Sequence, residues 1–143
     1  MVDSKKFREW LSKSKSDLDA ARLLYDYDHD LSLVAFHCQQ AVEKSLKGFI
    51  LALSGKLVSG HSLLTLVKVA ESIDSDFAEL KRDCSYLNQY YIETRYPPDI
   101  PFEITKSESE ECLKIAESIL TLIFKKLQMN LSTQPHPFLQ KNE

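Results

Sequence analysis

The chain has 143 residues, of which 43% are hydrophobic and 27% charged, and its formal net charge is −3 at pH 7. This length fits one domain, and the composition is that of a globular protein rather than a disordered or fibrous one. Three glycines and five prolines are too few turn residues for a sandwich or barrel, and the negative net charge argues against binding duplex DNA through bulk charge.

Apolar residues that recur at helical spacing predict a first helix from about Ser4 to Tyr27. A cluster of aspartates then breaks the pattern, and Asp30 is a suitable N-cap for a second helix. This second helix is predicted to run to about Ser54, where Gly55 provides a C-terminal stop. At about 100° per residue, one of its faces collects apolar and small side chains: Val34, Cys38, Ala41, Val42, Ser45, Phe49 and Leu53.

A third, shorter helix is predicted to begin near His61, and a fourth to run from about Asp76 to Thr94. Pro97 and Pro98 end the fourth helix, because a residue that precedes a proline is disfavoured in the α region. No internal repeat or domain linker interrupts this succession of helices.

A capping-box pattern, Thr105-Lys106-Ser107-Glu108, opens a fifth helix. Its apolar positions continue to Leu127, and the pattern is lost after Gln128 in a segment with two prolines. We therefore expect one helical domain over residues 1–128 and a flexible C-terminal tail over residues 129–143. Four long helices and one short helix, joined by short breaks, predict an all-α fold, an up-and-down antiparallel bundle.

The three cysteines, Cys38, Cys84 and Cys112, are odd in number and far apart, without a CxxC spacing. This disfavours a disulfide framework or a zinc site, and their positions on apolar helix faces predict burial in the core. The N-terminus lacks the apolar segment of a secretory signal, and no run is long enough to span a membrane. We therefore expect a cytoplasmic protein with no metal and no cofactor other than a nucleotide ligand.

The second helix carries a polar stripe of residues at i, i+3, i+7 and i+10: His37, Gln40, Lys44 and Lys47. Two ammonium groups, an imidazole and the nearby ring of Phe36 are suited to hold a phosphate and to stack a base. The same stripe also fits a solvated helix face, in which Lys47 forms an i,i+4 ion pair with Glu43.

A second candidate site surrounds Arg95, which lies among three tyrosines in the segment YYIETRYPP. An arginine at a corner fixed by prolines presents a rigid fork of donors suited to phosphate, and Tyr96 offers an aromatic ring. Alternatively, Arg95 stabilises the terminal carbonyls of the fourth helix. His61, which precedes the third helix, is a candidate cap of that helix, ligand or catalytic group.

Three segments resemble, in the same order, those of prokaryotic HEPN domains: AFHCQQAVEKSLK at residues 35–47, GHSL at 60–63 and YIETRYP at 91–97. The similarity extends over about residues 4–127. It implies a helical bundle, often a homodimer, that binds nucleotide or RNA. It also implies a separate minimal nucleotidyltransferase as partner, because such domains are often paired with one in toxin–antitoxin-like modules.

Some HEPN domains are metal-independent ribonucleases that use an arginine and a histidine with four to six residues between them. Arg95 matches this arginine, but the positions expected for the histidine hold Ile100, Pro101 and Phe102. None of these three side chains can act as a general acid or base. The resemblance therefore favours a non-catalytic member of the family.

We accordingly predict a nucleotide- or RNA-phosphate-binding protein, the non-catalytic partner of a minimal nucleotidyltransferase. The residues expected to form its site are Arg95, Tyr96, Gln40, Lys44, Lys47, His61 and Phe36. One alternative is a ribonuclease toxin in which His37 or His61 approaches Arg95, and another is a structural module whose polar stripe is only solvated. A homodimer is also expected, since several large side chains offer apolar surface for an interface: Trp10, Phe36, Tyr90 and Phe124.

Overall fold

The computed structural model describes residues 6–27, 30–91 and 103–132, and within these ranges it contains helices and no strand. Five α-helices follow one another: α1 (Phe7–Asp26), α2 (Leu31–Ser54), α3 (Leu63–Ile73), α4 (Lys81–Asn88) and α5 (Lys106–Lys126). A 3-10 helix, η2 (Ser75–Leu80), precedes α4. The predicted all-α fold is therefore confirmed. None of the helices in the described ranges is long and apolar enough to cross a lipid bilayer.

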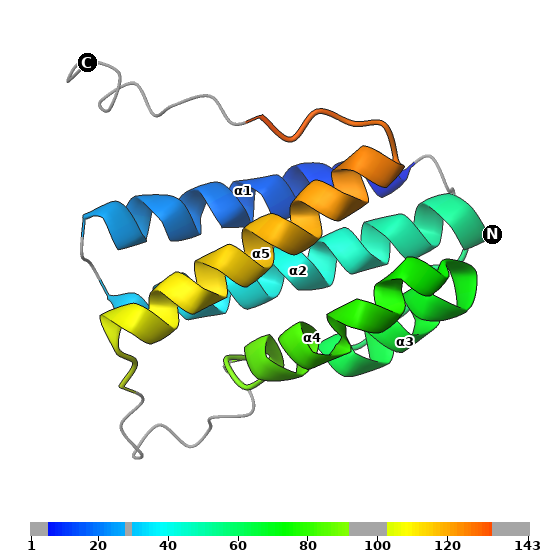
Figure 1. Ribbon diagram of the computed structural model, residues 1–143. Helices are drawn as coiled ribbons and strands as arrows, with labels where there is room; N and C mark the ends of the chain where they lie inside the picture. Colours follow the sequence, from blue (N-terminus) through cyan, green and yellow to red (C-terminus); the bar gives the residue numbers. More distant parts are fainter. Residues whose placement is uncertain (1–5, 28–29, 92–102, 133–143) are drawn as a thin grey trace.

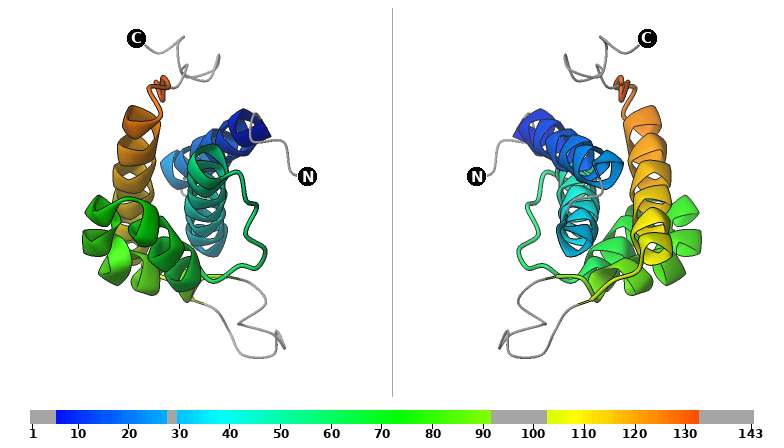
Figure 2. Two further views of the ribbon diagram at one scale, coloured as in Figure 1. Left: turned by 90° about the vertical axis from the view of Figure 1, so that its right-hand side faces the viewer. Right: turned by 90° about the vertical axis from the view of Figure 1, so that its left-hand side faces the viewer.

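The central helix of the bundle is α2, which packs against α1, α5 and α3. The long helices α1, α2 and α5 run side by side, and the shorter α3 and α4 form a pair next to them (Figure 1). This pair lies on the side of α2 that faces away from α1 (Figure 2). Because α2 has neighbours on several sides, it buries polar residues as well as apolar ones, among them Gln39, Glu43 and Lys47.

The predicted helix ends on α2 and α5 are confirmed. The Asp30 side chain accepts a hydrogen bond from the backbone N–H of Ser32, and Gly55 ends α2 in the left-handed region at φ 73°. At the start of α5, Thr105 and Glu108 form a capping box, in which each side chain bonds the backbone N–H of the other residue. Side-chain caps thus determine where α2 and α5 begin, and the left-handed backbone of Gly55 determines where α2 stops.

Two of the predicted elements differ in detail. Ser62 caps α3 by accepting a hydrogen bond from the backbone N–H of Thr65, so His61 is not the cap. The predicted fourth helix begins instead as the 3-10 helix η2, where the Asp74 side chain bonds the backbone N–H of Asp76. The helix α4 then ends at Asn88 and does not continue as predicted through residues 89–91. Residues 92–102, including Arg95 and the prolines that follow it, lie outside the described residues.

The core is continuous through the bundle and includes all three cysteines, which are free and fully buried as predicted. Helices α1 and α2 approach each other closely at Gly48. A Cβ atom at this position would lie 2.3 Å from Cδ2 of Leu11, well inside van der Waals contact. Gly48 therefore allows the close packing of α1 on α2 that positions the polar side chains between them.

Two of the four large side chains expected at a dimer interface belong to the core of the monomer. Tyr90 and Phe124 are each only 3% exposed, so their size does not argue for an interface. After α5, Met129 and Leu131 pack against the core, and the Lys15 ammonium donates a hydrogen bond to the backbone carbonyl of Ser132 at 3.0 Å. The first residues of the predicted tail thus follow the bundle, and residues 133–143 lie outside the described ranges.

Candidate functional site

A buried carboxylate organises the polar residues on one side of α2. The Glu43 side chain is 4% exposed, and its Oε2 accepts hydrogen bonds from Lys47 Nζ and His61 Nδ1, each at 3.1 Å. The amide nitrogens of Gln39 and Gln40 lie 3.4 Å from Oε1 of the same carboxylate. We call these five residues the Glu43 cluster. Such dense pairing is what a buried charge requires to be stable in a protein interior.

His61 connects this cluster to the chain that follows α4. Its ring stacks on Tyr91, with ring centroids 4.6 Å apart and an angle of 17° between the planes. Its backbone carbonyl accepts a hydrogen bond from Gln39 Nε2 at 3.3 Å. The His61 side chain is nevertheless 48% exposed, because the ring lies at the edge of the bundle. The cluster therefore presents an oriented imidazole to solvent.

A further hydrogen bond keeps the end of α4 next to the start of α3. The backbone N–H of Leu63 donates to Oδ1 of Asn88 at 2.9 Å. Leu63 lies two residues after His61, and Asn88 lies three residues before Tyr91. This contact explains why the His61 ring and the Tyr91 ring meet. The chain enters the segment that contains Arg95 and Tyr96 from this position, but those two residues are outside the described ranges.

The other two members of the polar stripe bind a carboxylate of α1. Lys44 Nζ donates to Oδ2 of Asp17 at 2.6 Å, and His37 Nδ1 donates to Oδ1 at 2.9 Å. Burial disfavours the charged form of Asp17, but these two hydrogen bonds outweigh it and lower the pKa of the carboxyl below its ordinary value of 3.8. The Phe36 ring lies edge-on to His37, 5.6 Å away.

The polar stripe is consequently neither a free cationic ridge nor a solvated face. Lys47 is 7% exposed and Lys44 24% exposed at the side chain, and each ammonium is neutralised by a carboxylate. The sequence shows the lysines and Glu43, but the pairing with Asp17 requires the packing of α1 on α2. The stack on Tyr91 likewise depends on a tertiary contact for which the sequence carries no signal.

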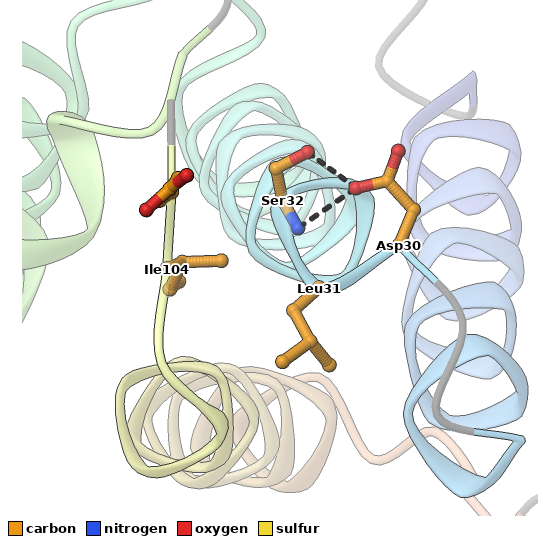
Figure 3. Close-up of a pocket in the computed structure, with 5 residues that line it drawn as sticks. Asp30, Leu31, Ser32 and Ile104 are labelled. Carbon is orange, nitrogen blue, oxygen red and sulfur yellow. Dashed lines mark hydrogen bonds between the residues drawn. The ribbon is translucent and has the colours of Figure 1, made fainter. Parts of the chain in front are cut away.

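A pocket of about 330 Å³ lies where α2 begins and is lined by Asp30, Leu31, Ser32, Glu103 and Ile104 (Figure 3). Oδ1 of Asp30 accepts hydrogen bonds from both the backbone N–H and the hydroxyl of Ser32. Two carboxylates and no basic residue line this pocket, so it is poorly suited to phosphate. Within the described ranges, no three His, Cys, Asp or Glu side chains are arranged to hold a metal ion.

The cysteines are unsuited to nucleophilic chemistry. Burial raises the pKa of Cys84 and Cys112 to about 12, and that of Cys38 lies well above its ordinary value for the same reason. The candidate groups in the described part of the chain are therefore the imidazole of His61 and its neighbours rather than a thiol.

Comparison with known proteins gives consistent results over nearly the whole bundle. A family model described as "HEPN domain" matches residues 7–127. A Methanocaldococcus jannaschii protein named "Putative toxin MJ1304" is 28% identical over 130 residues, which cover 80% of this chain and 83% of that protein. Two solved structures are also similar. TT1696 from Thermus thermophilus is 34% identical with a TM-score of 0.73, covering 85% of this chain and 98% of that one. ST0689, an archaeal HEPN homologue, is 25% identical with a TM-score of 0.64, and the match covers 84% of this chain and 96% of ST0689.

Proposed function

This chain belongs to the HEPN domain family, and on that premise we propose that it binds the phosphate of a nucleotide or of RNA beside the Glu43 cluster. In this proposal it is the non-catalytic partner of a minimal nucleotidyltransferase in a toxin–antitoxin-like module. The observation that carries the proposal is the stack of His61 on Tyr91, which joins the cluster to the chain leading to Arg95.

The distance along the chain supports a shared site. Arg95 follows Tyr91 by four residues, and four residues of extended chain reach about 14 Å at most. The guanidinium of Arg95 supplies two parallel donors to a phosphate, and the imidazole of His61 supplies one more. The ring of Tyr96 offers a surface on which a base can stack.

The remaining predicted residues act by holding this site in place. Because Lys47 and Gln40 bind Glu43, they fix the carboxylate that orients the His61 ring. Asp17 binds Lys44 and His37, which lie nearby on α2. The His37 ring in turn contacts the ring of Phe36. Direct contact with phosphate is thus assigned to His61 and Arg95, and orientation to the buried polar residues.

The partner part of the proposal rests on family membership. The Methanocaldococcus relative carries the name "Putative toxin MJ1304", which supports a role in a toxin–antitoxin-like module. A nucleotidyltransferase subunit and a second copy of this chain are the partners that the family resemblance implies. Purification of the protein from its native host, followed by identification of the proteins bound to it, tests both.

A ribonuclease is the second candidate, and one observation favours it. Glu43 accepts a hydrogen bond from Nδ1 of His61, so this carboxylate does not occupy the other ring nitrogen, Nε2, of a side chain that is 48% exposed. A carboxylate that orients a histidine in this way is a common arrangement in general acid–base catalysis. In this alternative, His61 takes the place of the histidine that is missing after Arg95.

Calorimetric titration with ATP, GTP and hexauridylate tests the binding proposal. We expect at least one of these ligands to bind the wild type and to bind Arg95→Ala at least tenfold more weakly. Arg82→Ala is the matched control, because Arg82 is an exposed arginine on α4 that the site does not use. Absence of heat with all three ligands, or equal binding to wild type and Arg95→Ala, contradicts the proposal.

Incubation of labelled RNA with the pure protein in excess chelator separates the two candidate functions. The proposal predicts intact RNA, since no complete ribonuclease motif is present. Cleavage that both Arg95→Ala and His61→Ala abolish would establish the ribonuclease instead.

A further inference from the structure

A second pocket opens between α1 and α2, with a volume of about 370 Å³ and a lining of Glu9, Trp10, Lys13 and Lys44. We call it the Trp10 pocket. Its volume is within the range of about 300–1,000 Å³ that is usual for small-molecule sites. Three of its lining residues come from the first turns of α1, and one belongs to the polar stripe of α2.

The side chain of Lys47 contacts both the Trp10 ring and the Glu43 carboxylate, and so connects the Trp10 pocket to the Glu43 cluster. The Lys47 ammonium lies 5.6 Å from the centroid of the Trp10 ring, at cation–π distance, and 3.1 Å from Oε2 of Glu43. Lys47 thus holds the indole ring on one side and the carboxylate that orients His61 on the other. The pocket and the proposed phosphate site are therefore neighbours on α2.

The charges of the pocket favour a neutral aromatic group over a bare phosphate. The Lys44 ammonium is already paired with Asp17, and the Glu9 carboxylate would repel an anion placed beside it. Lys13 is exposed and forms no ion pair within the described part of the chain. The Trp10 ring, with the lysine ammonium groups as donors and the Glu9 carboxylate as acceptor beside it, is suited to bind a nucleobase. Lys13 would then lie beside the sugar–phosphate backbone of the nucleic acid.

We propose that the Trp10 pocket binds one nucleobase of a single-stranded RNA by stacking on Trp10. The phosphate of a neighbouring nucleotide is then held at the Glu43 cluster. This inference rests on the proposed function and narrows its ligand from any nucleotide to an RNA of at least two nucleotides. Lys13 is the residue that contacts the phosphodiester at the mouth of the pocket.

Trp10 is the only tryptophan of the chain, so fluorescence excited at a wavelength that tyrosine does not absorb reports on this pocket alone. Titration with hexauridylate is expected to quench the fluorescence to saturation, because a stacked base changes the environment of the indole. Uridine monophosphate at the same concentrations is expected to leave it unchanged. Quenching by the mononucleotide at the same concentrations would overturn the assignment of the pocket as part of a longer RNA site.

Anisotropy of fluorescein-labelled hexauridylate measures affinity independently of the tryptophan. We expect Trp10→Leu to weaken binding at least fivefold and Lys13→Gln two- to fivefold. Lys68→Gln, which removes an exposed lysine of α3, is expected to bind as the wild type does. Because Lys13 is exposed, its variant keeps the test valid even if Trp10→Leu disturbs the packing of α1.

The outcomes distinguish this inference from the proposed function. RNA binding that depends on Arg95 but is unchanged in Lys13→Gln, with no quenching of Trp10, overturns the Trp10 pocket and leaves the phosphate site intact. Absence of any RNA binding to the wild type overturns this inference, and it overturns the proposed function as well only if ATP and GTP also fail to bind. Quenching together with weaker binding by Lys13→Gln supports the inference.

Discussion

Nδ1 of His61 lies 3.1 Å from Oε2 of Glu43, although the two residues are 18 positions apart. The contact joins the loop before α3 to the middle of α2, and the same carboxylate also binds Lys47. One buried acidic group therefore orients an exposed imidazole and neutralises a buried ammonium. Both the stability of α2 in the bundle and the geometry of the candidate site depend on it.

Removal of this carboxylate is expected to destabilise the protein strongly. Glu43→Ala leaves the Lys47 ammonium buried without its carboxylate counter-ion, and loss of one member of a buried ion pair typically costs about 3–5 kcal/mol. Urea unfolding followed by circular dichroism measures the loss. The double variant Glu43→Leu/Lys47→Met, which replaces the pair by apolar side chains, should recover most of the stability. A loss below about 1 kcal/mol in Glu43→Ala would show that the pair is solvated.

Asp17 makes stability depend on pH in the acidic range. Its pKa in the folded protein lies below 3.8, so it contributes stability that is complete above about pH 4 and is lost as pH falls through the folded pKa. Asp17→Asn should cost about 1.5–3 kcal/mol at pH 7, the usual worth of hydrogen bonds to charged groups. The difference in unfolding free energy between wild type and variant should shrink below pH 4. If the difference between the unfolding free energies of wild type and Asp17→Asn grows as pH falls below about 4, the lowered pKa of Asp17 is contradicted.

Much of the fold is predictable from the sequence because its signals are local. The N-cap at Asp30, the stop at Gly55 and the capping box at Thr105 each depend on residue types within a few positions of the helix end. The fourth helix is predicted less well, since its apolar spacing does not distinguish the 3-10 helix η2 from an α-helix. Both geometries place residues three apart near one face, and the choice between them depends on the packing against α3.

The thiols should be nearly inert in the folded protein. Burial raises the pKa of Cys84 and Cys112 to about 12 and also that of Cys38, so the reactive thiolate is scarce and shielded. We expect reaction with Ellman's reagent at pH 8 to be at least about a hundredfold slower in buffer than in 6 M guanidinium chloride. The denatured chain, with three reactive thiols, is the control. Rapid modification of one thiol in buffer would mean that its helix face is open to solvent.

A side chain at Gly48 should lower the stability of the protein modestly. A Cβ atom would lie 2.3 Å from Cδ2 of the buried Leu11, and overpacking of this kind costs about 1–3 kcal/mol. The higher helix propensity of alanine offsets about 1 kcal/mol of that cost, so a net loss of up to about 2 kcal/mol is expected for Gly48→Ala. Chemical denaturation of Gly48→Ala, Leu11→Ala and the double variant completes a mutant cycle. The double variant should be more stable than the sum of the single losses predicts, and additive losses would indicate that α1 and α2 do not touch there.

The candidate site could be predicted only in part from the sequence. Helical spacing groups the polar stripe correctly, but it does not reveal that α1 brings Asp17 to Lys44 or that Glu43 is buried. These contacts change the role that the lysines can play, from free cations to groups that hold carboxylates. Arg95 and Tyr96 lie outside the described residues, so their part in the site stays a prediction.

Contact between His61 and RNA can be measured from the nuclear magnetic resonance signals of the His61 imidazole during titration with hexauridylate. We predict that the His61 ring signals shift to saturation as RNA binds, and that Arg95→Ala requires at least tenfold more RNA for the same shift. His37, whose ring is held by Asp17 and to which no contact with RNA is assigned, serves as the internal control and should shift less than His61. RNA binding that moves the His37 signals and leaves those of His61 unchanged would contradict a phosphate site at His61.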